Sequence, residues 1–225
     1  MSRPQPESPL ALGRDDIWQV IGDQRRALAD LLAGLSAAQW QHPSLCAGWT
    51  IQDVAAHLTQ QQLSLAGTVG MMLHWRGSLD LTISDAARRR AADLSADEII
   101  AAIRGTAGSR RHTFGVTYLE TLTDALVHGQ DIAIPLDRPL AVPPGAAAAA
   151  ASRVLTMHWP RPLPATRNVT GFRLAATDVA WSAGDGPEVI GPMSAILLLC
   201  AGRAAALAQL SGPGVSGLAA RLTPA

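Results

Sequence analysis

Two short stretches of the sequence combine side chains that bind divalent metals. The first, Cys46–Leu58 (CAGWTIQDVAAHL), is a loop leading into a helix that presents His57 about two turns from its start. The second, Thr123–Asp131 (TDALVHGQD), places Asp124 four residues before His128. Residues at this spacing project from one face of a helix, one turn apart. Two imidazoles and one carboxylate would leave a divalent metal with an open coordination position, which a catalytic site needs.

The charge of such a site indicates its chemistry. A dication bound by one carboxylate keeps one positive charge and favours an incoming thiolate or hydroxide. Zinc and non-haem iron(II) both accept this donor set. The same Asp-x-x-x-His spacing also recurs in helices without a metal, where His128 would simply be a hydrogen-bonded helix residue.

Other polar residues near the two stretches have competing interpretations. Asp131 could orient His128 through a hydrogen bond, or could cap a turn. Cys46 is interpreted as a small buried side chain in a loop rather than as a nucleophile or ligand. Gln60 and Gln61 either line a pocket or are solvated.

Composition excludes several classes of protein. The 225 residues are 48% hydrophobic and 16% charged, which is typical of a globular chain. The formal net charge is zero and the 18 basic residues, all arginine, are scattered, so no nucleic-acid partner is expected. No signal peptide or membrane-spanning run is evident, and Cys46 and Cys200 could form at most one disulfide. We therefore expect a reduced, cytoplasmic setting and no membrane partner.

Helical patterns dominate the first part of the chain. Apolar residues at three- and four-residue spacing predict a helix over Asp15–Leu35, and Ser36 would cap a short turn after it. Thr50 followed by Asp53 matches a capping box and predicts a second helix from Thr50 to about Trp75.

The next segment shows less regular patterns. Gly77–Arg90 lacks a clear periodicity and predicts a loop with a short helical piece. A third helix is expected from Ser95 to about Arg104, and a fourth over Thr113–Ile134, ending before Pro135. Four helices with short connections predict a bundle.

The second part of the chain changes period. After a linker at Pro139–Pro144, an alanine-rich helix is expected over Gly145–His158. Alternating residues then predict three short antiparallel strands, within 169–175, at 179–181 and at 189–190. A last helix is expected from Pro192, carrying apolar residues up to Leu210. The predicted organisation is a mobile leader (1–10), a helical bundle (11–138) and a small α+β domain (139–225).

The chain resembles a known family at three places. Residues 46–58 resemble the second-helix signature of the mycothiol-dependent maleylpyruvate isomerase family, within the DinB/YfiT-like metal-binding four-helix bundles. Asp124–Leu136 resembles its later ligand-bearing stretch. Asp178, Trp181, Gly191-Pro192 and Ile196–Arg203 are similar to the C-terminal domain of the isomerase branch. The resemblance implies a mainly α fold, namely a DinB-like four-helix bundle followed by a small α+β C-terminal domain.

The resemblance also implies roles for particular residues. His57 and His128 match the two histidine ligands, and Asp124 stands where the isomerase branch has a glutamate. Glu120, one turn earlier, is a substitute for that carboxylate or an outer-face residue. Arg203 matches an arginine that, in the isomerase branch, reaches towards the cleft. There its guanidinium would act in catalysis and bind a carboxylate of the thiol cofactor or of the substrate. The alternative is that Arg203 is a surface residue.

These resemblances imply a metal-dependent enzyme, with Zn²⁺ as the expected ion and mycothiol as the thiol cosubstrate. The metal would lower the pKa of the thiol, and the thiolate would attack an electrophilic small molecule in an isomerase or transferase reaction. Two alternatives stay open, a hydrolase-like enzyme that uses metal-bound water and a non-catalytic metal- or small-molecule-binding protein. The protein is expected to be a monomer or a homodimer.

Overall fold

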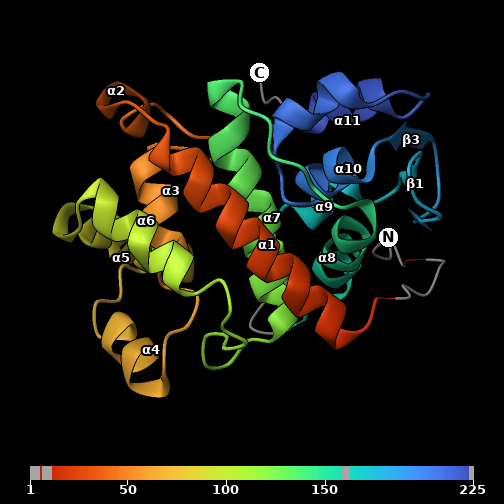
Figure 1. The fold of residues 1–225 in the computed structure, drawn as a ribbon. Coiled ribbons are helices and arrows are strands. Elements are labelled where there is room, and N and C mark those ends of the chain that lie inside the picture. The colour runs from red at the N-terminus through yellow and green to blue at the C-terminus, as the bar shows by residue number, and fades with distance from the viewer. Residues whose placement is uncertain (1–5, 7–11, 159–162, 223–225) are drawn as a thin grey trace. The chain divides into compact units, whose positions relative to one another are not determined.

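The computed structural model describes Pro6, residues 12–158 and residues 163–222 (Figure 1). By its internal contacts the chain divides into two compact units. One is Trp18–Ala141, and the other joins Met1–Ile17 to Val142–Ala225. The predicted mobile leader lies outside the described residues, except for Pro6, which forms an isolated antiparallel bridge with Ala183. Among the described helices, none has the length and apolarity to span a membrane.

The first unit is built from helices around one apolar core. The core is formed by side chains from α1, α3, α6 and α7, including the fully buried Leu32, Ile51, Ile99 and Ile132. Its elements are α1 (Arg14–Ala33), α2 (Ala37–Trp40), α3 (Ile51–Leu58), α4 (Leu65–Met72), α5 (Leu79–Asp93), α6 (Ala96–Gly105), α7 (Tyr118–Ala133) and the 3₁₀ turn η1 (Ile134–Leu136).

Side-chain caps define where several of these helices begin. Thr50 accepts a hydrogen bond from the Asp53 amide, and the Asp53 carboxylate accepts one from the Thr50 amide. Equivalent capping boxes start α2 at Ser36 and α6 at Ser95. Each box satisfies amides that the first helical turn leaves without partners. The starts predicted from these caps are confirmed.

In the first unit, three predictions about where helices lie are wrong. The predicted helix from Thr50 to Trp75 is two helices, because α3 stops at Leu58 and the chain turns before Ser64 caps α4. In that turn the Leu63 amide donates to the Thr113 hydroxyl, a long-range bond that replaces a helical one.

The other two corrections concern α5 and α7. Gly77–Arg90 is mostly helical, because Ser78 caps α5, which runs through to Asp93. Helix α7 begins at Tyr118, later than the predicted Thr113, because Thr117 and Glu120 form the capping box there.

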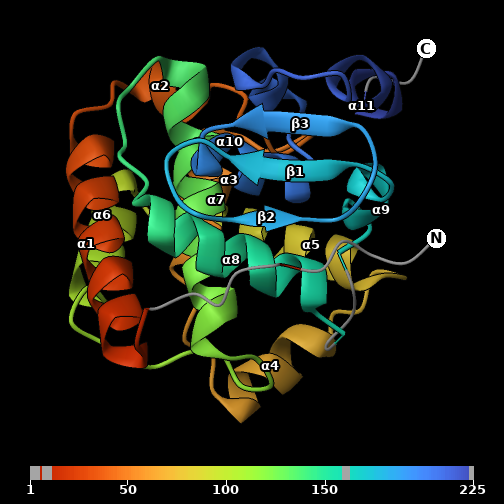
Figure 2. The ribbon, with the colours of Figure 1, turned by 90° about the vertical axis from the view of Figure 1, so that its right-hand side faces the viewer.

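The second unit combines helices with a three-stranded sheet (Figure 2). Helix α8 packs against α10, and α10 also contacts β1. Its elements are α8 (Pro144–Thr156), α9 (Thr166–Val169), β1 (Arg173–Ala176), β2 (Ser182–Ala183), β3 (Glu188–Gly191), α10 (Met193–Cys200), the 3₁₀ helix η2 (Ala204–Gln209) and α11 (Val215–Leu222).

The prediction of three antiparallel strands is wrong for one pair. The strand order is β2-β1-β3; β1 pairs with β2 antiparallel and with β3 parallel, with Leu174 opposite Val189. After β2, residues 184–187 lead the chain around the end of β1 to its other edge, where β3 runs parallel to β1 (Figure 2).

Long-range hydrogen bonds fix the end of the second unit. The Asp178 carboxylate accepts from the Met193 amide and caps α10, and the Trp181 indole donates to the Ser152 hydroxyl on α8. The predicted last helix, from Pro192 to Leu210, is two elements, α10 and η2, because α10 stops at Cys200, before Gly202, which has a positive φ of 84°. The predicted fold class, mainly helical with a small C-terminal sheet, is confirmed.

Candidate metal centre

The three predicted ligands come together in the first unit. Helix α3, which carries His57, packs against α7, which carries Asp124 and His128. One ligand atom from each of these residues lies within 4.8 Å of the other two. The imidazole rings of His57 and His128 meet edge to face, with centroids 5.0 Å apart.

The separation of His57 and Asp124 fits a bridging ion better than a direct contact. Nε2 of His57 is 3.9 Å from Oδ2 of Asp124, which is too long for a hydrogen bond. Metal–ligand bonds of about 2 Å in a tetrahedral site place two donor atoms about 3.3 Å apart. A small closure around an ion would therefore bring both atoms to coordination distance.

Exposure differs among the three candidate ligands. The side chains of His57 and His128 are 17% and 16% exposed, whereas that of Asp124 is 42% exposed. The site is therefore reached from the Asp124 side. Access of this kind is what an open coordination position requires.

A second group of donors shares His128. Oδ2 of Asp131, whose side chain is completely buried, lies 2.8 Å from Nδ1 of His128 and 3.0 Å from the Cys46 thiol. The thiol is also 3.6 Å from Nδ1 of His128. These three residues form a further candidate cluster for a metal ion.

The distances distinguish the two groups. In the Cys46–His128–Asp131 cluster, the contacts to Asp131 have hydrogen-bond length and are shorter than the roughly 3.3 Å edge of a zinc polyhedron. We therefore interpret this cluster as hydrogen-bonded support. Since Asp131 engages Nδ1 of His128, Nε2 is the nitrogen left for an ion. The interpretation of Asp131 as a residue that orients His128 agrees with this bond.

The two histidines have opposite electrostatic environments. Burial, followed by repulsion from His128, lowers the pKa of His57 to about 3, so its imidazole is neutral, the form that binds metals. Burial also lowers the pKa of His128, but the hydrogen bonds that its ring makes to Asp131 and Cys46 outweigh burial and raise that pKa to about 10. Binding an ion at Nε2 of His128 would release a proton.

His57 is held mainly by packing. Its Nδ1 is buried and has no hydrogen-bond partner among the described residues. The indole of Trp49 packs edge-on against the ring, with centroids 5.5 Å apart, and is itself fixed by a hydrogen bond to Ser84 on α5.

The remaining predicted residues lie in different places. Glu120 accepts the Thr117 amide in the capping box of α7, which favours the outer-face role over that of a substitute ligand. Arg203 belongs to the second unit, where its half-buried guanidinium donates to the Ala201 carbonyl at 2.6 Å. Gln61 is buried, accepts from Arg25 and lines a small cavity, so it is not a solvated side chain.

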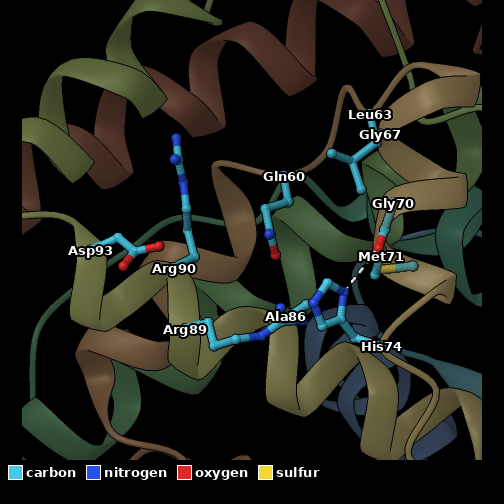
Figure 3. A pocket seen from close by; sticks show the side chains of 10 residues that line it. All are labelled: Gln60, Leu63, Gly67, Gly70, Met71, His74, Ala86, Arg89, Arg90 and Asp93. Carbon is cyan, nitrogen blue, oxygen red and sulfur yellow. Dashed lines mark hydrogen bonds between the residues drawn. The ribbon is translucent and has the colours of Figure 1, made fainter.

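Gln60 lines a cavity of about 210 Å³ between α4 and α5 (Figure 3). Its amide donates to the carbonyl of His57, so the cavity begins at the end of the ligand-bearing helix. Figure 3 shows the Arg89 and Gln60 side chains extending towards the ring of His74, whose Nδ1 lies 3.1 Å from the Gly70 carbonyl. The wall also includes Leu63 and Met71, which makes the cavity partly apolar.

Sequence reasoning missed the contacts of Cys46 with Asp131 and His128. Its loop position gave no basic neighbour in sequence, and the contact with Asp131 spans 85 residues. The sequence did contain a signal for these contacts, since Cys46 and His57 both lie in the stretch 46–58.

Fold and site together define a helical bundle protein with a candidate His/His/carboxylate centre and a small appended sheet unit. Residues 21–117 match the family model of the mycothiol maleylpyruvate isomerase N-terminal domain, which confirms the resemblance for this stretch of the chain. The matched region includes Cys46 and His57 and stops just before α7. No curated protein matches the chain.

Two solved structures are similar to this one. A crystal structure of a histidine-to-alanine mutant of the mycothiol-dependent maleylpyruvate isomerase has a TM-score of 0.53 and 16% identity, covering 90% of this chain and 93% of that chain. A crystal structure of the mycothiol-dependent maleylpyruvate isomerase has a TM-score of 0.49 and 17% identity over the same shares. At this identity the first similarity shows a shared fold.

The stability of the metal-free protein should depend on His57 below neutral pH. An unfolded imidazole binds a proton below about pH 6.5, whereas folded His57 stays neutral down to about 3. Between these values the unfolded state binds more protons, so the free energy of unfolding falls as the pH is lowered. We expect His57→Gln to remove this contribution, at most about 1.4 kcal/mol per pH unit, in urea unfolding with chelator present. Identical pH slopes for the two proteins would contradict the assignment.

Proposed function

We propose that this protein is a metal-dependent enzyme that joins a low-molecular-weight thiol, mycothiol or a close chemical relative, to an electrophilic small molecule. The observation that carries the proposal is the convergence of His57, Asp124 and His128 on one point, with a His57–Asp124 separation that suits a bridging ion. The N-terminal domain match supports the thiol. Zinc is the proposed ion, and the cytoplasm, where thiols are kept reduced, the proposed setting.

The donor set fits such an ion, because a neutral buried imidazole, a second imidazole oriented by a carboxylate and a half-exposed carboxylate are all good ligands for zinc. When bound, the ion supplies a positive charge that lowers the pKa of the thiol. His57 and His128 hold the donor geometry, and the exposed side at Asp124 admits thiol and electrophile.

The reaction proposed is addition to a conjugated double bond. The thiolate sulfur forms a bond to one alkene carbon, and the π electron pair moves onto the conjugated carbonyl. The former double bond can then rotate, and elimination of the thiolate restores it in the other geometry. In an isomerase the thiol is regenerated; in a transferase the carbon–sulfur bond is kept and the enolate carbon takes up the proton that the thiol lost. The cavity bordered by Gln60 and Arg89 is a candidate location for the electrophile.

Metal content tests the ligand assignment. We expect His57→Ala and His128→Ala to lose most of the bound metal when the protein is purified without added metal and measured by elemental analysis. His42→Ala is the control, because its side chain is exposed and, among the described residues, hydrogen-bonds only to the adjacent Pro43 carbonyl. If both site variants retain as much metal as wild type, the site is misplaced.

Thiol dependence tests the reaction class. With maleylpyruvate or another conjugated electrophile as substrate, turnover should require an added low-molecular-weight thiol and should return to background when the thiol is omitted. Activity that is unchanged without thiol would reject this mechanism and favour the hydrolase-like alternative.

Arg203 is proposed to bind a carboxylate of the thiol or the electrophile. We expect Arg203→Ala to lower kcat/KM roughly 10- to 100-fold, as the loss of a hydrogen bond to a charged group does, while metal content stays the same. Arg167→Ala in the same unit, where the side chain is exposed, provides the matched control. Loss of metal with unchanged kcat/KM would reject this role for Arg203.

A further inference from the structure

The loop before α3 is a closed structure. Pro43 and Thr50 form an antiparallel bridge, with the Ser44 amide donating to the Trp49 carbonyl at 2.9 Å. The Ser44 hydroxyl also donates to that carbonyl and accepts from the Cys46 amide, and Gly48 adopts a φ of 75°, which few other residues tolerate. These bonds define the direction of the Cys46 side chain.

This loop is attached to Asp131 of α7 through both backbone and side chain. The Leu45 amide donates to the carbonyl of Asp131 at 3.1 Å, and the Cys46 thiol donates to its carboxylate at 3.0 Å. The oxygen that accepts from Cys46, Oδ2, is the same one that accepts from Nδ1 of His128. Since Asp131 is fully buried, its carboxylate depends on protein donors rather than on water.

The same loop also contacts the other histidine. Trp49, three residues after Cys46, packs its ring against His57 and is anchored to Ser84. One closed loop therefore contacts both imidazoles, His57 by packing and His128 through the Asp131 carboxylate.

We propose that Cys46 is a positioning residue whose thiol holds the Asp131 carboxylate in the rotamer that orients His128 towards the ion. This inference rests on the proposed metal site. Without the thiol, Oδ2 of Asp131 would lose a donor and could rotate away from Nδ1 of His128. The ring of His128 would then be fixed less well, and the ion would bind more weakly.

Two substitutions at Cys46 separate hydrogen bonding from packing. Cys46→Val removes the donor without leaving a cavity, whereas Cys46→Ser keeps a donor and loses volume. By competition titration with zinc, we expect Cys46→Val to bind about 10-fold more weakly than wild type, as changes next to metal ligands do, and Cys46→Ser to stay close to wild type. Cys200→Ala, the other cysteine of the chain, is the control. If Cys46→Val binds zinc as tightly as wild type, or Cys46→Ser is the weaker of the two, the proposal is wrong.

Cobalt substitution gives a readout that a packing defect alone would not produce. With Co²⁺ in place of zinc, wild type should show visible bands without a thiolate-to-cobalt charge-transfer band, and Cys46→Val should shift the visible bands because His128 is reoriented. A charge-transfer band in wild type that disappears in Cys46→Ser would make Cys46 a ligand and overturn the proposal. If Cys46→Val does not fold by circular dichroism, Cys46→Ala is measured in the same way and judged by the same outcomes.

His57→Ala separates this inference from the proposed function. If His57→Ala binds zinc as tightly as wild type, the metal site itself is wrong. If His57→Ala loses zinc while the donor-free Cys46 variants do not, the metal site stands and only the role of Cys46 is rejected.

Discussion

The buried carboxylate of Asp131 is the group on which the geometry of the candidate centre depends. A carboxylate without solvent is costly unless it is paired and hydrogen-bonded. Here it is stabilised by His128 and by the Cys46 thiol, and its backbone carbonyl accepts from the loop. These requirements place the loop before α3 against α7. The same packing brings His57 to Asp124, because α3 continues directly from that loop.

The two histidines are consequently held in different ways. His128 has a hydrogen-bonded Nδ1 and a raised pKa, whereas His57 is neutral, with a buried Nδ1 that lacks a partner among the described residues. A metal ion would suit the protonation state of each ring in a different way. It would take the place of the Nε2 proton on His128, and the neutral ring of His57 can donate a lone pair without first losing a proton.

Features encoded locally were predictable from the sequence. A capping box involves four consecutive residues, so the helix starts at Thr50 and Ser95 could be identified directly. The Asp124–His128 face follows from helical spacing in the same way. The end of α3 could not be predicted, since it depends on Thr113, about fifty residues further on. The parallel pairing of β3 with β1 is set by a chain crossing that alternation of side chains does not report.

The contact between Cys46 and Asp131 was missed for the same reason, because the thiol interacts with α7 and not with its sequence neighbours. A cysteine in a loop has the same local pattern whether it fills space or holds a carboxylate. Asp124 is the reverse case, because the resemblance already marked it as an aspartate where a glutamate ligand is implied. Aspartate is one methylene shorter than glutamate, so its carboxylate stays nearer to its own helix, α7, and here its Oδ2 lies 3.9 Å from Nε2 of His57. An ion bound there would be drawn towards α7, where the ring of His128 has to meet it. The shorter the carboxylate, the more the site depends on the orientation of that ring, and therefore on Asp131.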